Sequence, residues 1–211
     1  MVERIKIVKP ADIEKKSFEI ISGILGDRVF PTLHEPVIKR VIHTTADFDY
    51  ADILNISENA IERGMEAIRN GCNIVTDTKM AASGINKKAL CRYGGQVVCF
   101  MENQDVAEEA KKRGITRAAI CMEKASQNPD NQIFAIGNAP TALIRLYELI
   151  VEGSIKPAMV VGVPVGFVNV VESKELFKKA GVPYIISEGR KGGSNVAAAI
   201  VNAVLYMMCC K

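Results

Sequence analysis

The fold is decided by residues 133–163, which read IFAIGNAPTALIRLYELIVEGSIKPAMVVGV. Two short apolar runs, residues 133–136 and 159–163, flank a helical stretch over residues 141–151. Short apolar runs that alternate with helical stretches are typical of β-α units, in which the strands of a parallel sheet are buried on both faces. We therefore expect two parallel strands joined by a crossover helix.

The same alternation continues on both sides of this stretch. Three further apolar runs bring the number of expected strands to five. Ahead of them, apolar residues recur at helical spacing, and Ser57 is a candidate N-cap. The expected strands are residues 74–76, 97–101, 133–136, 159–163 and 184–187, and the expected helices are residues 11–25, a segment opened by Pro36, 57–70, 87–93, 104–113, 116–126, 141–151, 173–180 and a C-terminal helix from Asn195.

No Pro-, Gly- or Ser-rich linker, fixed-period repeat or low-complexity tract interrupts this order. The length of 211 residues suits one sizeable domain, and 48% hydrophobic with 24% charged residues excludes a disordered or collagenous chain. We therefore expect residues 1–211 to form a single α/β domain, with a five-stranded, mostly parallel sheet flanked by helices and a helical N-terminal section.

Charge and hydropathy argue against two classes of partner. The formal net charge of +3 is too small for a nucleic-acid-binding surface. The longest near-apolar stretch, residues 196–210, contains Asn202 and falls short of the roughly 20 apolar residues that a membrane span needs. Residues 1–6 alternate charged and apolar side chains and lack the apolar region of a secretory signal, so we expect a cytoplasmic protein.

The sequence also lacks the usual signatures of bound metals and nucleotides. Its six cysteines include no C-x-x-C pair and no set of four ligands with a histidine, so neither structural zinc nor, in a chain without a signal, disulfides are expected. No G-x-G-x-x-G follows the first strand and no G-x-x-x-x-G-K-[ST] is present, which disfavours dinucleotide and P-loop ATP chemistry.

Polar and glycine residues follow the expected strands, at the sheet edge where open α/β proteins bind ligands. Gly-rich turns that lead into helix N-termini expose N–H groups and bind phosphates or carboxylates. The last turn can equally be a flexible connection, and both interpretations stay open. The segments concerned contain Thr76, Asp77 and Lys79 after the first strand, Asn138 after the third, and Arg190, Lys191, Gly192 and Gly193 after the fifth.

Few side chains are candidates for proton transfer or anion binding. His34 lies in a Pro-bounded turn and is expected to be a solvated loop residue. His43, three residues after Arg40, is either a helix C-terminal histidine stabilised by the dipole or a general acid beside an anion-binding arginine. Asp77 can be catalytic, although a capping role is commoner. Arg117 starts a helix, where a cation is best explained by an anionic partner.

Five motifs together resemble the precorrin-8X methylmutase family, whose counterpart in cobalt-first pathways is cobalt-precorrin-8 methylmutase. They are residues 9–18, 41–50, 136–143, 162–168 and 189–194, which read KPADIEKKSF, VIHTTADFDY, IGNAPTAL, GVPVGFV and GRKGGS. They occur in the family's order over almost the whole chain.

The resemblance implies an isomerase of corrin ring synthesis, on the way to cobalamin. It implies migration of a methyl group from ring carbon 11 to ring carbon 12 of precorrin-8X or cobalt-precorrin-8, giving hydrogenobyrinate or cobyrinate, with no cofactor, metal or methyl donor. It further implies a homodimer with its active site near the subunit interface. An intramolecular methyl shift needs little more than orientation and one well-placed acid, which suits a chain with two histidines.

The resemblance also assigns roles to residues. His43 stands in the motif of the family's histidine, which donates a proton or hydrogen bond to a pyrrole nitrogen. Ser17 and Arg40 match positions that contact substrate. The substrate's acetate and propionate arms suit arginines and the glycine-rich turn. The family context suggests that Thr76, Asp77, Lys79, Arg117, Asn138, Arg190, Gly192 and Gly193 line the pocket.

Two alternatives belong to other classes. A non-catalytic corrinoid carrier would bind the same ligand without converting it. An α/β enzyme acting on a phosphorylated metabolite would use the glycine-rich turn for phosphate. The sequence leaves open whether the substrate carries cobalt.

Overall fold

The computed structural model of the chain describes residues 9–209. Residues 1–6, on which the expectation about a secretory signal rests, lie outside the described residues, as does Cys210. Within residues 9–209 no helix is long and apolar enough to cross a membrane.

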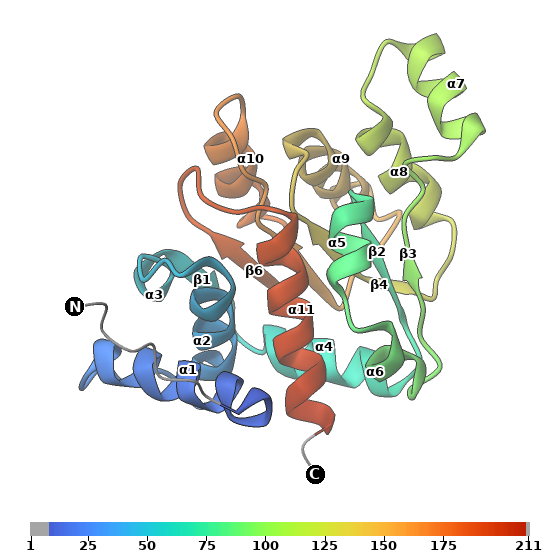
Figure 1. The fold of residues 1–211 in the computed structure, drawn as a ribbon. Coiled ribbons are helices and arrows are strands. Elements are labelled where there is room, and N and C mark those ends of the chain that lie inside the picture. Colours follow the sequence, from blue (N-terminus) through green and yellow to red (C-terminus); the bar gives the residue numbers. More distant parts are fainter. Residues whose placement is uncertain (1–8, 210–211) are drawn as a thin grey trace, which may run out of the picture.

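The centre of the fold is a six-stranded sheet in the order β1-β6-β5-β4-β2-β3 (Figure 1). All five expected strands are present and pair in parallel with one another. The expected number was nevertheless wrong, because β1 pairs antiparallel with β6 at one edge. The strands are β1 (Leu54–Ile56), β2 (Asn73–Thr76), β3 (Val97–Val98), β4 (Asn131–Ile136), β5 (Met159–Gly162) and β6 (Tyr184–Ser187).

Helices cover both faces of the sheet, because the buried strands are apolar on both sides. Along β4, Ile133 and Ala135 join one core cluster, whereas Phe134 and Ile136 join the other. The first layer contains α1 (Pro10–Leu25), α2 (His34–Thr45), α3 (Tyr50–Ile53), α4 (Ala60–Arg69), α5 (Lys79–Gly84), α6 (Lys87–Cys91) and α11 (Ser194–Cys209), and the second contains α7 (Gln104–Arg113), α8 (Arg117–Ser126), α9 (Pro140–Val151) and α10 (Val170–Phe177).

Three helix starts differ from those that the sequence predicts. The helix expected from Ser57 begins at Ala60, because the Ser57 hydroxyl accepts the Tyr184 N–H at 2.8 Å and so does not cap it. His34, expected in a solvated loop, is the first residue of α2 and is half-buried. The short helix α5 was missed, although Thr78 caps it by accepting the Ala81 N–H at 3.0 Å.

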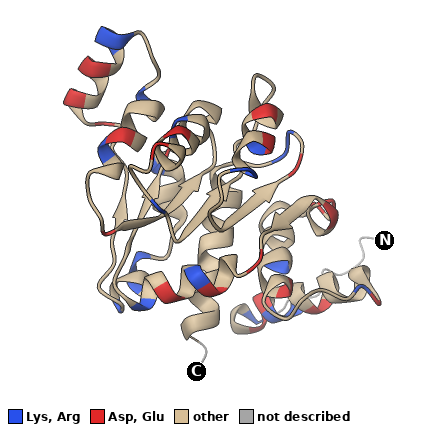
Figure 2. Ribbon diagram, turned by 180° about the vertical axis from the view of Figure 1, so that it is seen from behind, with Lys and Arg blue, Asp and Glu red and all other residues tan. Residues whose placement is uncertain are grey.

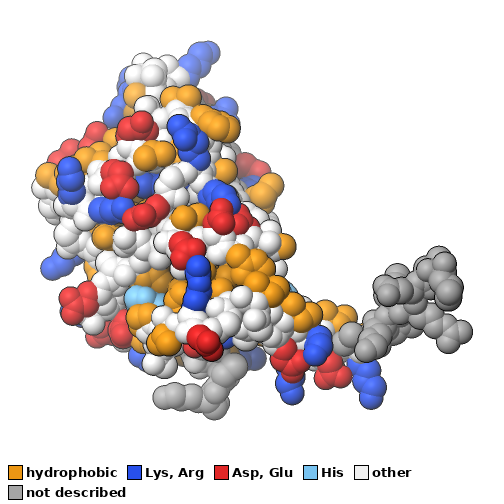
Figure 3. Space-filling model, turned by 90° about the vertical axis from the view of Figure 1, so that its left-hand side faces the viewer, with side chains coloured by type: hydrophobic (Ala, Val, Ile, Leu, Met, Phe, Trp, Pro, Cys, Tyr) orange, Lys and Arg blue, Asp and Glu red, His pale blue; other side chains and the backbone are white. Residues whose placement is uncertain are grey.

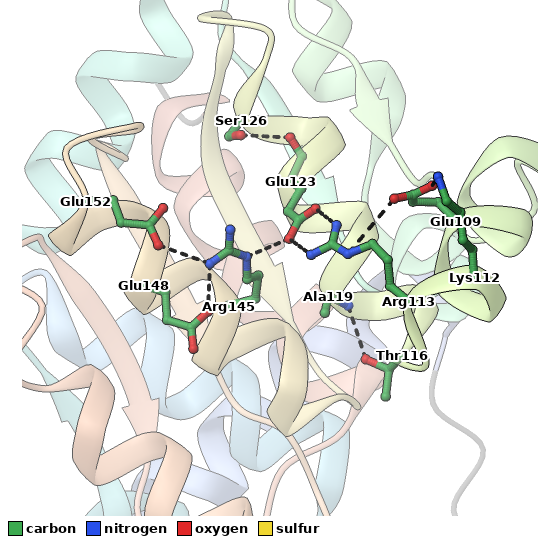
Figure 4. A network of polar contacts seen from close by, with 10 residues as sticks. All are labelled: Glu109, Lys112, Arg113, Thr116, Ala119, Glu123, Ser126, Arg145, Glu148 and Glu152. Carbon is green, nitrogen blue, oxygen red and sulfur yellow. Dashed lines mark hydrogen bonds and ion pairs between the residues drawn. The ribbon is translucent and has the colours of Figure 1, made fainter.

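Acidic and basic side chains are interleaved on the helices seen from behind in Figure 2. One ion-pair network joins α7, α8 and α9 (Figure 4). Glu123 accepts hydrogen bonds from Arg113 at 2.6 and 3.0 Å and from Arg145 at 2.8 Å. Arg145 also contacts Glu148 at 2.7 Å and Glu152 at 3.2 Å. The Arg113 hydrogen bonds, helped by Arg145, hold the pKa of Glu123 below its usual value despite partial burial.

Glu123→Gln is expected to destabilise the fold by about 1 kcal/mol at pH 7, the upper end for a partly exposed ion pair. Because the folded-state pKa of Glu123 is lowered, its stabilisation is present above its unfolded pKa of about 4.3 and is lost as pH falls through the folded value. Urea unfolding at pH 7 and pH 3 measures both effects. Glu58→Gln, which removes an exposed carboxylate outside the network, is the control, and equal stability of the two variants at pH 7 would contradict the prediction.

Candidate functional site

A groove of about 670 Å³ lies where α1, α2 and α11 meet. Arg40 and His43 of α2 line it together, as their spacing of three residues on one helix edge predicts. The apolar side of α2 packs into the core, so these two polar side chains are left facing α1. The remaining lining residues are Pro10, Ile13 and Glu14 from α1 and Tyr206 and Cys209 from α11.

The imidazole of His43 is held flat against an aromatic ring. Its centroid lies 5.3 Å from that of Phe18, and the two ring planes differ by 18°. His43 is an exposed residue that lines the groove, and Phe18 covers one face of its imidazole. This arrangement fits a hydrogen-bond donor to a bound ligand, and the position in the last turn of α2 also suits a histidine beside the helix dipole.

The guanidinium of Arg40 lies over two aromatic rings. Its carbon is 4.8 Å from the Phe18 centroid and 4.9 Å from the Tyr206 centroid, and the side chain is ion-paired with Glu14. Flat guanidinium groups stack well on aromatic faces, so the two rings fix the plane in which Arg40 can meet a partner. An anionic ligand at this site competes with Glu14 for the same cation.

Ser17 lies on α1 next to Phe18 in the sequence and is half-buried. Its hydroxyl donates a hydrogen bond to the Ile13 carbonyl, 2.9 Å away, within the same helix. It is not among the side chains that line the groove. Contact between Ser17 and a ligand therefore stays a prediction.

Asp77 follows β2 and is fully buried at the carboxyl edge of the sheet. Its carboxylate accepts the N–H groups of Gly137, Asn138 and Ala139 at 2.9, 2.8 and 2.7 Å. Burial raises the pKa of Asp77, and the three hydrogen bonds act in the opposite direction. The capping role weighed above is wrong for the helix that follows Asp77, because Thr78 caps α5. Asp77 instead holds the turn that leads into α9.

The other residues predicted at the strand ends are spread along this edge. Thr76 is buried and donates to the Thr78 carbonyl at 3.0 Å. Lys79 is ion-paired with Glu102. Asn138 is exposed after β4. Arg117 is exposed at the start of α8 beside α7, in the other helix layer from Arg40 and His43.

The turn between β6 and α11 approaches the β5–α10 loop closely. The Gly193 N–H donates to the Val163 carbonyl at 2.9 Å, and a Cβ atom at Gly192 would lie only 2.1 Å from that oxygen. Position 192 therefore requires glycine for steric reasons. Arg190 is exposed on the same turn.

Lys191 ties this turn to the segment that follows His43. Its ammonium contacts Asp47 at 2.5 Å and Asp49 at 2.6 Å, just beyond the end of α2. The Lys191 hydrogen bond lowers the pKa of Asp47. The β6–α11 turn and the histidine helix are thus joined, although they are far apart in the sequence.

Sequence reasoning missed three side chains that contact Arg40 or His43. Glu14 and Phe18 are four apart on α1 and share a helix face, which their spacing could have indicated. Tyr206 reaches the groove from α11, and no local spacing relates it to Arg40. Among residues 9–209, no group of three His, Cys, Asp or Glu side chains is placed to hold a metal ion.

Comparison with known proteins shows which proteins this chain resembles. A family model described as precorrin-8X methylmutase matches residues 12–207. The cobalt-precorrin-8 methylmutase of Salmonella typhimurium is 48% identical over 95% of this chain and 96% of its own, and that of Priestia megaterium is 47% identical over 93% and 88%. The crystal structure of precorrin-8x methyl mutase from Thermus thermophilus superposes with a TM-score of 0.86 at 38% identity, covering 94% of this chain and 98% of that one.

Both kinds of comparison therefore span nearly the whole chain, and the family match includes all of α2 and most of α1 and α11. Identities of 38, 47 and 48% over nearly the whole chain show the family as well as the fold. The chain belongs to the precorrin-8X methylmutase family.

Proposed function

We propose that this chain is an isomerase of corrin ring synthesis that moves a methyl group from ring carbon 11 to ring carbon 12 of precorrin-8X or cobalt-precorrin-8, giving hydrogenobyrinate or cobyrinate. Family membership supports this activity. The observation that carries it is the groove in which His43 and an aromatically clamped Arg40 lie together. The two relatives at 47 and 48% identity are named for the cobalt-containing substrate, which favours cobalt-precorrin-8.

The reaction requires the protein mainly to bind the substrate and to polarise its conjugated ring. A methyl shift within a conjugated ring is intramolecular, so rate is gained by holding the reactive tautomer and stabilising the charge that develops. In our proposal His43 donates a proton or hydrogen bond to a pyrrole nitrogen, while Phe18 keeps the imidazole plane fixed.

Anion recognition in this proposal centres on Arg40 and Arg190. Arg40 takes a carboxylate arm after Glu14 yields, because both anions need the same guanidinium. Arg190 takes a second arm from the β6–α11 turn, where Gly192 and Gly193 lead into α11. Ligand contacts at Ser17, Thr76, Lys79, Arg117 and Asn138 remain predictions. Asp77 acts through the turn it caps.

We also propose a homodimer with the active site near the subunit interface. Ile13, Ile20 and Ile24 are 52, 54 and 61% exposed at helical spacing on α1, and Ile13 also lines the groove. On the face drawn in Figure 3, hydrophobic side chains are most frequent in the lower half, among charged and polar ones. A second copy covering this stripe would lie next to His43. A cytoplasmic location is proposed as well, supported by free thiols at the five described cysteines.

His43→Ala is expected to lower kcat by about 10²–10⁴-fold, the usual contribution of general acid catalysis, while a corrinoid still binds. The assay follows conversion of excess substrate to a product of equal mass and different absorption. His34→Ala, on the same helix and outside the groove, is the matched control. Unimpaired turnover by His43→Ala would remove the assigned role. A wild-type protein that releases no more than one product per chain would instead be the carrier considered above.

Arg40→Ala is expected to weaken corrinoid binding by about 1.5–3 kcal/mol, the range for a hydrogen bond to a charged group. Titration followed by visible absorption measures the dissociation constant. Arg28→Ala removes an exposed arginine paired with Asp52 and should bind like the wild type. Equal affinity of wild type and Arg40→Ala would show that Arg40 does not hold a carboxylate arm.

Ile20→Glu is expected to raise the dimer dissociation constant more than tenfold, because burying one isoleucine is worth roughly 2 kcal/mol and a charge cannot take its place. Sedimentation measures the molecular mass as a function of concentration. Val151→Glu, at an exposed position at the end of α9, should leave the dimer intact. A dimer unaffected by Ile20→Glu would place the interface elsewhere.

A further inference from the structure

A fully buried lysine lies beneath the β6–α11 turn. Lys174 of α10 is 0% exposed, and its ammonium donates to the carbonyls of Gly189 and Lys191, each at 2.9 Å, and to the Ser187 hydroxyl at 3.2 Å. Within residues 9–209 no carboxylate lies within ion-pair distance of it. Its three N–H donors are therefore matched by three neutral acceptors.

Burying an ammonium without a carboxylate partner is costly, so we expect this lysine to have a role that an apolar side chain could not fill. Removing an ammonium from water is unfavourable, and an apolar side chain of equal volume would fill the same space without that cost. Burial lowers the pKa of Lys174 to about 8, so the ammonium keeps all three donors at pH 7. A satisfied polar cluster in the interior fixes one conformation of the groups that it contacts.

The groups that Lys174 contacts lie on both sides of Arg190. Gly189 and Lys191 are its two neighbours in the chain, so the ammonium holds the carbonyl of the residue before and of the residue after this arginine. The outer side of the turn is held too, because the Arg190 carbonyl accepts the Gly166 N–H at 3.3 Å. Arg190 itself is exposed.

We propose that Lys174 is a positioning residue for substrate binding, which aims Arg190 at a carboxylate arm by clamping the carbonyls on either side of it. The proposal rests on the proposed function, since it takes the partner of Arg190 to be the corrinoid substrate. Lys174 does not touch the substrate. Its contribution is to keep the turn in the one conformation that binds.

Lys174→Met keeps the length of the side chain and removes all three donors. KM is expected to rise about tenfold and kcat to change by less than about threefold, because the turn then spends only a fraction of its time in the binding conformation. Lys179→Met, at an exposed lysine shortly after α10, is the control and should match the wild type in both constants. An unchanged KM in Lys174→Met would overturn the proposal.

A double-mutant cycle with Arg190→Ala separates aiming from general support. If Lys174 acts through Arg190, Lys174→Met should change KM by less than about twofold in the Arg190→Ala background. Independent, multiplicative effects on KM would overturn the proposal. Thermal unfolding checks each variant, and Lys174→Gln replaces the methionine variant if that does not fold.

Three further outcomes distinguish a failure of this inference from a failure of the proposed function. If neither Lys174→Met nor Lys174→Gln folds, the lysine supports the fold as a whole and the aiming role is wrong. If the wild type converts no corrinoid, the proposed function fails and this inference falls with it. Normal wild-type turnover with an unaffected Lys174→Met overturns this inference alone.

Discussion

The carboxyl edge of the sheet depends on two buried charges of opposite sign that hold the backbone of two turns. Asp77 accepts three N–H groups from the turn before α9, and Lys174 donates to two carbonyls of the turn before α11. Each charge has backbone partners, with Ser187 as the one side-chain exception. Because both charges are satisfied by backbone groups, they fix the turns from which ligand-binding side chains project.

The groove, in contrast to the turns at the sheet edge, is built from helices. At its centre, Arg40 lies over the aromatic rings of Phe18 on α1 and Tyr206 on α11. The same Phe18 ring stacks on His43, so one side chain contacts both Arg40 and His43. Lys191 then joins the end of α2 to the β6–α11 turn, which places the helical groove and the sheet edge in one continuous framework.

The sequence predicted those features that depend on local patterns. Apolar runs located five strands, and helical spacing placed Arg40 beside His43. Strand β1 was missed because Leu54, Asn55 and Ile56 form no apolar run and gain their pairing only from β6. The Ser57 cap was wrong because a distant backbone N–H takes its hydroxyl. Tyr206 could not be predicted, because nothing in local spacing relates positions 40 and 206.

The stacking of Arg40 has a consequence for substitution at this position. A guanidinium is planar and can present its two faces to two rings at once, whereas an ammonium is compact, strongly hydrated and has no faces. Arginine and lysine are therefore not interchangeable at position 40, even though the exchange preserves charge. The shape of the cation, and not its sign alone, is what the surrounding rings select.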